Sequence, residues 1–196
     1  MKTEDKYVTL CKRVKNCPKE IKTNWFVITG APSSGKTTLL QRLASKGYNV
    51  NPDMSRKLLE QNLQSGLRPE QVRAAEREFQ SELLQLMVDV ELKLLPDDLI
   101  FHEYALPDNV AFWRKAGFEL PEVLLQSARL FKYREIFVLE PLELKRDGIR
   151  IESEADQKVI HNLILESYRE VGYEPIIIPV GSVESRIENV LRYLPV

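Results

Sequence analysis

Short runs of consecutive apolar residues alternate along this chain with longer segments in which apolar residues recur every three or four positions. The runs predict strands buried on both faces, and the longer period predicts amphipathic helices. Strands that alternate with helices favour a parallel sheet covered on both sides. We therefore expect the α/β class, as a three-layer sandwich around a mainly parallel five-stranded sheet. The strands are expected at residues 25–29, 48–51, 99–102, 135–139 and 175–180.

The predicted helices are bounded by residues that favour helix termini. Gly47 and Gly172 follow helical segments as C-terminal caps, and proline opens several others. In the longest segment, apolar residues from Val72 to Leu94 form one stripe, which we expect to pack on the sheet rather than to bind a cofactor. The helices are expected at residues 37–46, 55–64, 69–95, 107–115, 121–131, 154–171 and 183–194.

The loop after the first strand carries a complete phosphate-binding motif, G-x-x-x-x-G-K-[ST]. Gly35 allows the backbone N–H groups to converge on phosphates, and the positive end of the next helix points at the same place. Lys36 is expected to reach the β- and γ-phosphates and the Thr37 hydroxyl to ligate Mg²⁺. The motif predicts a P-loop NTPase sandwich that binds ATP or GTP with Mg²⁺. The residues expected to contact the nucleotide here are Gly30, Ala31, Pro32, Ser33, Ser34, Gly35, Lys36, Thr37 and Thr38.

Polar residues also follow the other predicted strands, at the sheet edge where ligands bind in such folds. Glu103 follows the third strand, where a carboxylate either completes the Mg²⁺ shell or takes a proton from an acceptor hydroxyl. Asp53 and Arg56 follow the second strand and are candidate substrate-binding residues, with Arg56 either holding an anionic acceptor or pairing with Asp53. Gly181 and Ser182 follow the last strand, where we expect the base of the nucleotide.

A basic loop, residues 145–150, follows the fourth strand and contains Gly148. Its cations suit a lid that closes over a triphosphate, so Arg146 and Arg150 join Lys36 and Glu103 as catalytic candidates; the alternative is a solvated basic turn. His102 is expected inside the fold, because phosphoryl transfer contains no step that needs a histidine.

Composition excludes several classes of function. The 28 basic residues nearly cancel the 29 acidic ones, leaving a net charge of −1 and no global field for nucleic acid or anionic lipid. No apolar run reaches the roughly 18 residues of a membrane span, and residues 1–22 lack a signal-peptide core. We therefore expect a cytoplasmic protein, with no nucleic-acid or membrane partner; the oligomeric state stays open. Cys11 and Cys17 are expected to be reduced, and they lack the further ligands that zinc requires.

The length of 196 residues favours one P-loop nucleotide-binding domain at residues 23–196, after an N-terminal extension at residues 1–22.

These motifs resemble the AAA-type ATPase/kinase-like P-loop family that is related to the kinase domain of bacterial NAD-metabolism regulators. The resemblance runs from about Trp25 to Leu194. It implies nucleotide binding and kinase-like or ATPase chemistry. In that family Asp-Arg-Gly precedes the Pro-Asp pair, whereas here the residues are Glu103, Tyr104 and Ala105, so the carboxylate is kept but the arginine is lost. The segments that carry the resemblance are residues 29–38, 51–56, 106–108, 147–152 and 179–182.

Two functions follow from these residues. The first is an ATP-dependent phosphotransferase acting on a small molecule such as a nucleoside or nucleotide, in which Lys36 and Mg²⁺ polarise the γ-phosphate and Glu103 is the base. The alternative is a regulatory or scaffold ATPase or GTPase with little or no phosphotransfer, since Tyr104 cannot supply the charge of an arginine unless Arg146 and Arg150 compensate. Analysis of the products distinguishes them.

Overall fold

The computed structural model describes residue 14, residues 20–143 and residues 154–195. Its central sheet has five parallel strands in the order β3-β4-β2-β6-β7, which confirms the predicted α/β fold class. Each strand lies within one or two residues of its predicted position. The strands are β2 (Trp25–Thr29), β3 (Asn49–Asn51), β4 (Ile100–Glu103), β6 (Glu135–Leu139) and β7 (Ile176–Ile178).

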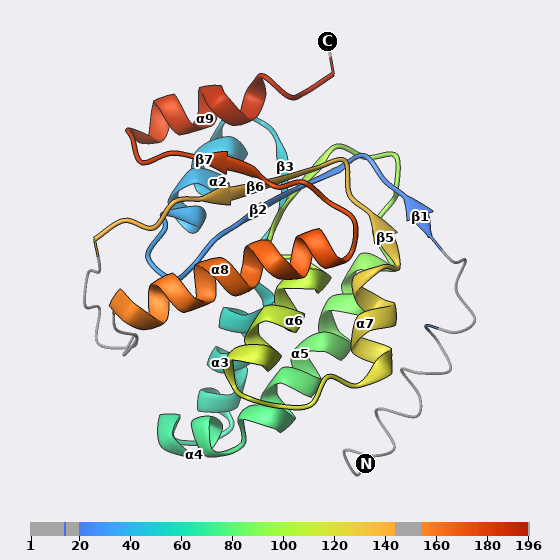
Figure 1. The fold of residues 1–196 in the computed structure, drawn as a ribbon, viewed down its shortest axis with the longest axis vertical. Coiled ribbons are helices and arrows are strands. Elements are labelled where there is room, and N and C mark those ends of the chain that lie inside the picture. Colours follow the sequence, from blue (N-terminus) through green and yellow to red (C-terminus); the bar gives the residue numbers. More distant parts are fainter. Residues whose placement is uncertain (1–13, 15–19, 144–153, 196) are drawn as a thin grey trace.

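Helices cover both faces of the sheet (Figure 1). Alternate residues of β2 explain the layering: Phe26 and Ile28 pack in a core with α2 and α9, whereas Trp25 and Val27 pack in the core formed with α5, α6 and α8. All five residues of β2 are buried, as expected of a central strand. The helices are α2 (Lys36–Ser45), α3 (Met54–Gln64), α4 (Pro69–Ala74), α5 (Glu76–Glu91), α6 (Leu106–Lys115), α7 (Glu122–Ala128), α8 (Glu154–Glu170) and α9 (Val183–Leu191).

Two predicted helices differ from the structure. The segment 69–95 is not one helix, because Ala75 leaves helical geometry at φ −103° and ψ 35° and separates α4 from α5. In the segment 121–131 the helix ends at Ala128, and the chain then forms β5 (Phe131–Lys132). Burial explains this early end, since the Phe131 ring lies 5.0 Å from the Trp25 ring in the core.

A small second sheet joins β5 to β1 (Ile21–Lys22) in parallel. This strand lies at the end of the predicted N-terminal extension, and Val14 is also buried against the core. The domain boundary at residue 22 stays a prediction. Among the described helices, none is both long and apolar enough to cross a lipid bilayer.

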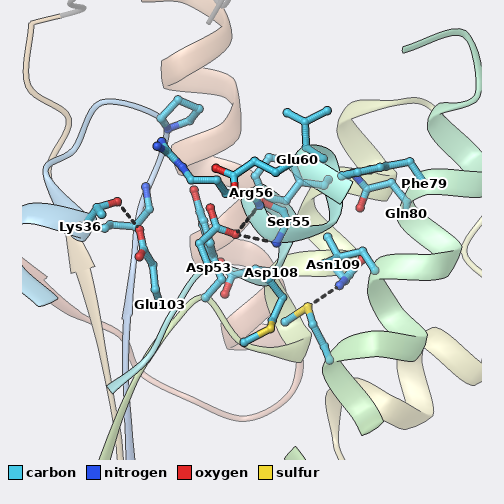
Figure 2. Close-up of a pocket in the computed structure, with 18 of the residues that line it drawn as sticks. Lys36, Asp53, Ser55, Arg56, Glu60, Phe79, Gln80, Glu103, Asp108 and Asn109 are labelled. Atoms are coloured by element: carbon cyan, nitrogen blue, oxygen red, sulfur yellow. Dashed lines mark hydrogen bonds between the residues drawn. The ribbon is translucent and has the colours of Figure 1, made fainter. Parts of the chain in front are cut away.

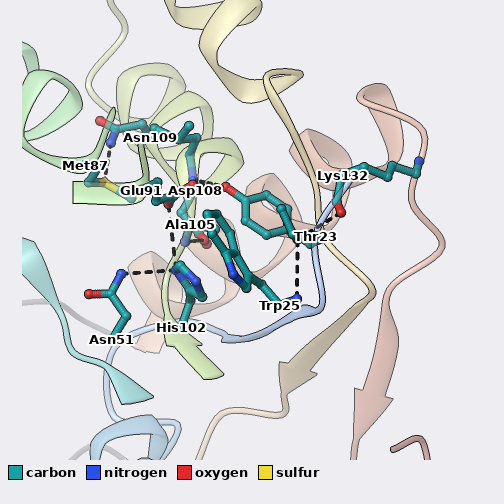
Figure 3. A network of polar contacts seen from close by, with 12 residues as sticks. Thr23, Trp25, Asn51, Met87, Glu91, His102, Ala105, Asp108, Asn109 and Lys132 are labelled. Carbon is teal, nitrogen blue, oxygen red and sulfur yellow. Dashed lines mark hydrogen bonds and ion pairs between the residues drawn. The ribbon is translucent and has the colours of Figure 1, made fainter. Parts of the chain in front are cut away.

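Buried polar side chains lie between the sheet and the helices that cover it (Figure 3). The Tyr133 hydroxyl donates to Glu91 Oε2 at 2.7 Å, and Glu91 Oε1 lies 3.8 Å from His102 Nδ1. Asn51 Nδ2 lies 3.1 Å from the same His102 nitrogen. Burial lowers the pKa of His102 to about 3 and raises the pKa of Glu91 to about 8, so both groups are held neutral near pH 7. The prediction that His102 lies inside the fold is confirmed.

A second buried carboxyl, Asp108, joins three elements. It accepts hydrogen bonds from the Thr29 hydroxyl at the end of β2 and from the Tyr168 hydroxyl of α8. It also accepts one from the N–H group of Ala105, the residue directly before α6. Burial raises the pKa of Asp108 to about 6, against the lowering effect of these hydrogen bonds. Asp108 therefore fixes the start of α6 beside the loop that follows β2.

Replacing Glu91 by glutamine tests the buried proton. The folded protein keeps a proton on Glu91 up to a pKa of about 8, whereas the ordinary value is 4.5, so the stability contributed by the neutral carboxyl is lost as pH rises between those values. Glu91→Gln stays neutral and keeps an acceptor for Tyr133. We expect the free energy of unfolding of the variant, relative to wild type, to rise between pH 5 and 8.5 by on the order of 4 kcal/mol.

Chemical denaturation across that pH range measures this difference. Glu78→Gln, at an exposed position of the same helix, is the control and should show no such trend. A Glu91→Gln difference that is flat with pH would contradict the buried neutral carboxyl.

Candidate functional site

The loop between β2 and α2 takes a conformation that depends on two glycines. Gly30 has φ +142°, and a Cβ there would lie 2.7 Å from the Leu139 carbonyl oxygen. Gly35 has φ +87° and immediately precedes α2. Other residues rarely adopt these angles, so both positions favour glycine.

Each carbonyl oxygen of residues 30–34 accepts a hydrogen bond from a side chain or an N–H group that lies beyond these five residues. Lys36 Nζ donates to the carbonyls of Gly30 and Ala31 at 2.9 Å each. The next carbonyls are those of Pro32, Ser33 and Ser34, which accept from Gln157 Nε2 at 2.8 Å, from the Leu142 N–H at 3.3 Å and from Arg186 Nη1 at 2.6 Å. The backbone orientation of the loop is therefore fixed from its outer side.

The N-terminus of α2 has no side-chain cap. Its hydrogen-bond ladder begins with the Leu39 N–H, which donates to the Gly35 carbonyl at 3.1 Å, and the preceding residues Lys36, Thr37 and Thr38 line a cavity. The N-terminal N–H groups of a helix carry partial positive charge. The start of α2 therefore suits an anion.

Tyr104 packs over the Lys36 side chain. The ammonium group of Lys36 lies 4.6 Å from the centre of the Tyr104 ring, within the range of a cation–π interaction. The Tyr104 hydroxyl lies 3.4 Å from the Gly30 carbonyl oxygen, and Tyr104 itself has φ +64°, in the left-handed region. This uncommon backbone angle turns the side chain back towards the P-loop.

Glu103 and Thr37 lie far apart in the sequence but contact each other in the structure. Glu103 ends β4, is 5% exposed, and accepts a hydrogen bond from the Thr37 hydroxyl at 2.6 Å. Burial raises the pKa of Glu103, and repulsion from Asp53 raises it further, while the Thr37 hydrogen bond and Lys36 lower it. A carboxyl oxygen and a hydroxyl oxygen thus meet beside the start of α2.

Asp53 caps a helix rather than pairing with the Arg56 guanidinium. Its Oδ1 accepts from the Ser55 N–H at 2.8 Å and from the Ser55 hydroxyl at 2.6 Å, and the Arg56 contact is through the backbone N–H at 3.4 Å. Asp53 thereby begins α3. Both residues line the cavity, as expected of substrate-binding candidates.

A cavity of about 600 Å³ extends from the P-loop to the helices (Figure 2). We call its two parts the phosphate end and the helical end. The phosphate end is formed by Gly35, Lys36, Thr37, Thr38 and Glu103, and the helical end by Glu60, Glu76, Phe79, Gln80, Leu83, Glu91, Asn109 and Phe112. The apolar stripe of the predicted helix 69–95 therefore packs in the core but also places Phe79 and Leu83 on the cavity wall.

Some predicted site residues are not brought to this cavity. Gly181 and Ser182 do not line it, and the Ser182 hydroxyl instead accepts from the Ser185 N–H at the start of α9. Arg146 and Arg150 lie outside the described residues. In the described part of the chain, no cluster of three or more histidine, cysteine, aspartate or glutamate side chains could hold a metal ion.

Arg186 is a buried residue that holds the P-loop in place and that the sequence did not reveal. It is 3% exposed, and besides the Ser34 carbonyl it donates from Nη2 to the Glu140 carbonyl and from Nε to the Pro179 carbonyl, both at 2.9 Å. One guanidinium therefore ties the P-loop to the segments that follow β6 and β7. The sequence shows only an arginine within an amphipathic helix, which is normally a surface position.

Comparisons with known proteins agree with this geometry. A protein-family model described as an AAA domain matches residues 25–186. No curated protein matches the chain.

Three solved structures share the chain's fold. Deoxyadenosine kinase from M. mycoides aligns with a TM-score of 0.60 at 16% identity, over 86% of this chain and 96% of that one. NadR protein in complex with NR aligns with a TM-score of 0.66 at 14% identity, over 87% of this chain and 50% of NadR, so this chain spans about half of NadR. Thymidylate kinase from Ehrlichia chaffeensis aligns with a TM-score of 0.57 at 11% identity, over 89% and 98% of the two chains.

Replacing Arg186 tests whether the P-loop is held from outside. Arg186→Met leaves three backbone carbonyls without their donor, and we expect the free energy of unfolding to fall by about 2–4 kcal/mol. At a temperature where the variant is folded, ATP affinity should also fall about tenfold, because the loop loses its fixed orientation. Arg186→Lys should recover only part of the loss, since one ammonium cannot span the three acceptors.

Denaturation and calorimetry measure the two effects. Arg192→Met, at the exposed residue that directly follows the same helix, should change stability by less than about 0.5 kcal/mol. A folded Arg186→Met variant with unchanged ATP affinity would show that Arg186 only stabilises the fold.

Proposed function

This chain belongs to the AAA domain family and has a P-loop kinase-like fold, and on this premise we propose that it transfers the γ-phosphoryl group of ATP, or GTP, to a hydroxyl of a small molecule. The observation that carries the proposal is the contact between Thr37 and Glu103 at the phosphate end of a cavity that continues to the helical end. A phosphate site alone serves any nucleotide-binding protein. A buried carboxyl beside it, facing space for a second ligand, serves phosphoryl transfer.

The triphosphate is proposed to occupy the phosphate end. The uncapped start of α2 and the P-loop N–H groups favour the phosphate oxygens. Residues 30–38 remain the proposed contacts, of which Pro32, Ser33, Gly35, Lys36, Thr37 and Thr38 line the cavity. Lys36 has a flexible stem, and a phosphate oxygen offers its ammonium a stronger, charge-assisted acceptor than the carbonyls it contacts now. Gly181 and Ser182 remain the proposed contacts for the base, and Arg146 and Arg150 the proposed lid.

The donor set fits Mg²⁺. Thr37 and Glu103 place a hydroxyl and a carboxyl oxygen 2.6 Å apart, and Mg²⁺ prefers such hard oxygen ligands, taking one or two from protein and the rest from water and phosphate. The carboxyl of Asp53 raises the pKa of Glu103 by repulsion, which a divalent cation between the site and the phosphates would offset. When bound, Mg²⁺ neutralises the charge on the β- and γ-phosphates.

Glu103 is proposed as the base as well. Burial raises its pKa towards neutrality, and a base is most effective when its pKa lies near the working pH. In this step the acceptor hydroxyl loses its proton to a Glu103 oxygen while its own oxygen attacks the γ-phosphorus. The bond to the β,γ-bridging oxygen then breaks and ADP leaves. Asp53 and Arg56, on the cavity wall, are proposed to position the acceptor.

Thr37→Val tests the metal ligand. Valine keeps the shape of threonine but lacks the hydroxyl, so ATP affinity in the presence of Mg²⁺ should fall about tenfold or more, with little change in EDTA. Calorimetry under the two conditions measures the difference. Thr37→Ser keeps the hydroxyl and should behave like wild type. Equal losses with and without Mg²⁺ would remove Thr37 from the metal shell.

Glu103→Gln tests the transfer step. Removal of a general base should lower the rate of transfer by roughly a hundredfold to ten-thousandfold, while ATP affinity measured in EDTA, where the metal role of Glu103 does not contribute, changes little. The assay supplies labelled ATP and a panel of small-molecule acceptors and identifies the phosphorylated product. Glu143→Gln, an exposed carboxyl on the rim of the same cavity, is the control and should retain the rate.

The outcomes also separate the two functions. A Glu103→Gln variant with full transfer would remove Glu103 as base. A wild-type protein that binds and hydrolyses ATP but phosphorylates no acceptor would instead support the regulatory or scaffold function.

A further inference from the structure

The helical end of the cavity contains two buried hydrogen-bond acceptors that have no donor. Gln80 of α5 is 4% exposed and Asn109 of α6 is 2% exposed, and both line the cavity. Gln80 Oε1 and Asn109 Oδ1 have no hydrogen-bond partner. A buried acceptor left unpaired costs about 1–3 kcal/mol, so two such oxygens on one cavity wall point to a ligand that donates to them.

The orientation of both amides is fixed by their nitrogen atoms. Gln80 Nε2 donates to Glu76 Oε1 at 2.9 Å, and Asn109 Nδ2 donates to Met87 Sδ at 3.0 Å. Turning either amide over would place its oxygen against a carboxylate or a thioether, neither of which can donate. In both amides, the group left without a partner is therefore the oxygen and not an N–H group.

Charge and shape at this end disfavour an anion. Glu60 and Glu76 line it, together with the neutral Glu91 carboxyl. The described lysines and arginines that line the whole cavity are Lys36, at the phosphate end, and Arg56, on the same helix as Glu60. Phe79 and Phe112 add aromatic surface from the same two helices. Figure 2 shows Phe79, Gln80 and Asn109 across the cavity from Lys36 and Glu103. The ligand group bound here is thus uncharged or cationic, planar in part, and distant from the phosphates.

We propose that the helical end binds a nitrogen heterocycle with N–H donors, such as an amino-substituted nucleobase, and that Gln80 and Asn109 determine this specificity. The inference rests on the proposed function, because it names the class of acceptor. A heterocycle held by Gln80 and Asn109 directs an attached sugar hydroxyl along the cavity towards Glu103. Glu76 is a positioning residue, since it holds the Gln80 amide with the oxygen towards the ligand.

Pairs of nucleosides that differ by one exocyclic amino group test the proposal. The pairs are adenosine with purine riboside, guanosine with inosine, and cytidine with 2-pyrimidinone riboside. Calorimetry of the full chain, saturated with a non-hydrolysable ATP analogue and Mg²⁺, gives the affinity of each. We expect the amino-bearing member of at least one pair to bind about tenfold or more tightly, because its absence leaves a buried acceptor unpaired.

Variants of Gln80 and Asn109 test whether these two amides cause the preference. Gln80→Met and Asn109→Leu keep the side-chain size but remove the acceptor, and at least one should reduce the preference to threefold or less. Gln85→Met is the matched control, because Gln85 lies on the same helix and also donates to an acidic residue one turn away, at 2.8 Å, but does not line the cavity. It should keep the wild-type preference.

The results separate this inference from the proposed function. Failure of the wild-type chain to bind the ATP analogue would remove the proposed function itself. If the analogue binds but the two nucleosides of every pair bind with equal affinity, the inference alone is overturned. The same holds if the analogue binds and no nucleoside does. A preference that survives in both Gln80→Met and Asn109→Leu would overturn the roles of these two residues.

Discussion

The site depends on one constraint: the carbonyl groups of a buried loop need hydrogen-bond donors, and most of those donors come from other elements of the fold. In this chain the carbonyls of residues 30–34 are satisfied by donors from α2, α8, α9 and the segment after β6. Buried carbonyls without donors would cost more than the loop's own turns can recover. The phosphate site is therefore a property of the whole α/β sandwich and not of the P-loop sequence alone.

The buried acidic groups on the cavity wall show the same balance of charge and burial. Glu91 and Asp108 are both almost fully buried, and burial raises the pKa of each carboxyl. Lys36 lowers the pKa of Asp108 through its charge, so the P-loop and this buried carboxyl influence each other. Glu91 therefore gives the helical end a polar group that is held neutral at pH 7.

The sequence alone was sufficient to predict those parts of the fold that local residue patterns determine. The strands could be predicted because each is a short apolar run, and Glu103 could be placed because parallel strands end at one edge of the sheet. Arg186, Gln157 and the amides of Gln80 and Asn109 could not be predicted, because their partners lie on other elements, far away in sequence. The break at Ala75 also escaped prediction, since alanine favours helices and only the tertiary fold interrupts the backbone there.

Tyr104 changes which groups supply positive charge in the site. It stands where the family that the motifs resemble carries arginine, and its ring lies 4.6 Å from the Lys36 ammonium. An arginine in that place would repel Lys36, whereas the face of an aromatic ring attracts it, so the tyrosine stabilises the arrangement of the P-loop before any ligand binds. It adds no positive charge for a transferring phosphoryl group. In the proposed transfer, the positive charge that stabilises the transition state would then come from Lys36, from Mg²⁺ and from the arginines of the proposed lid.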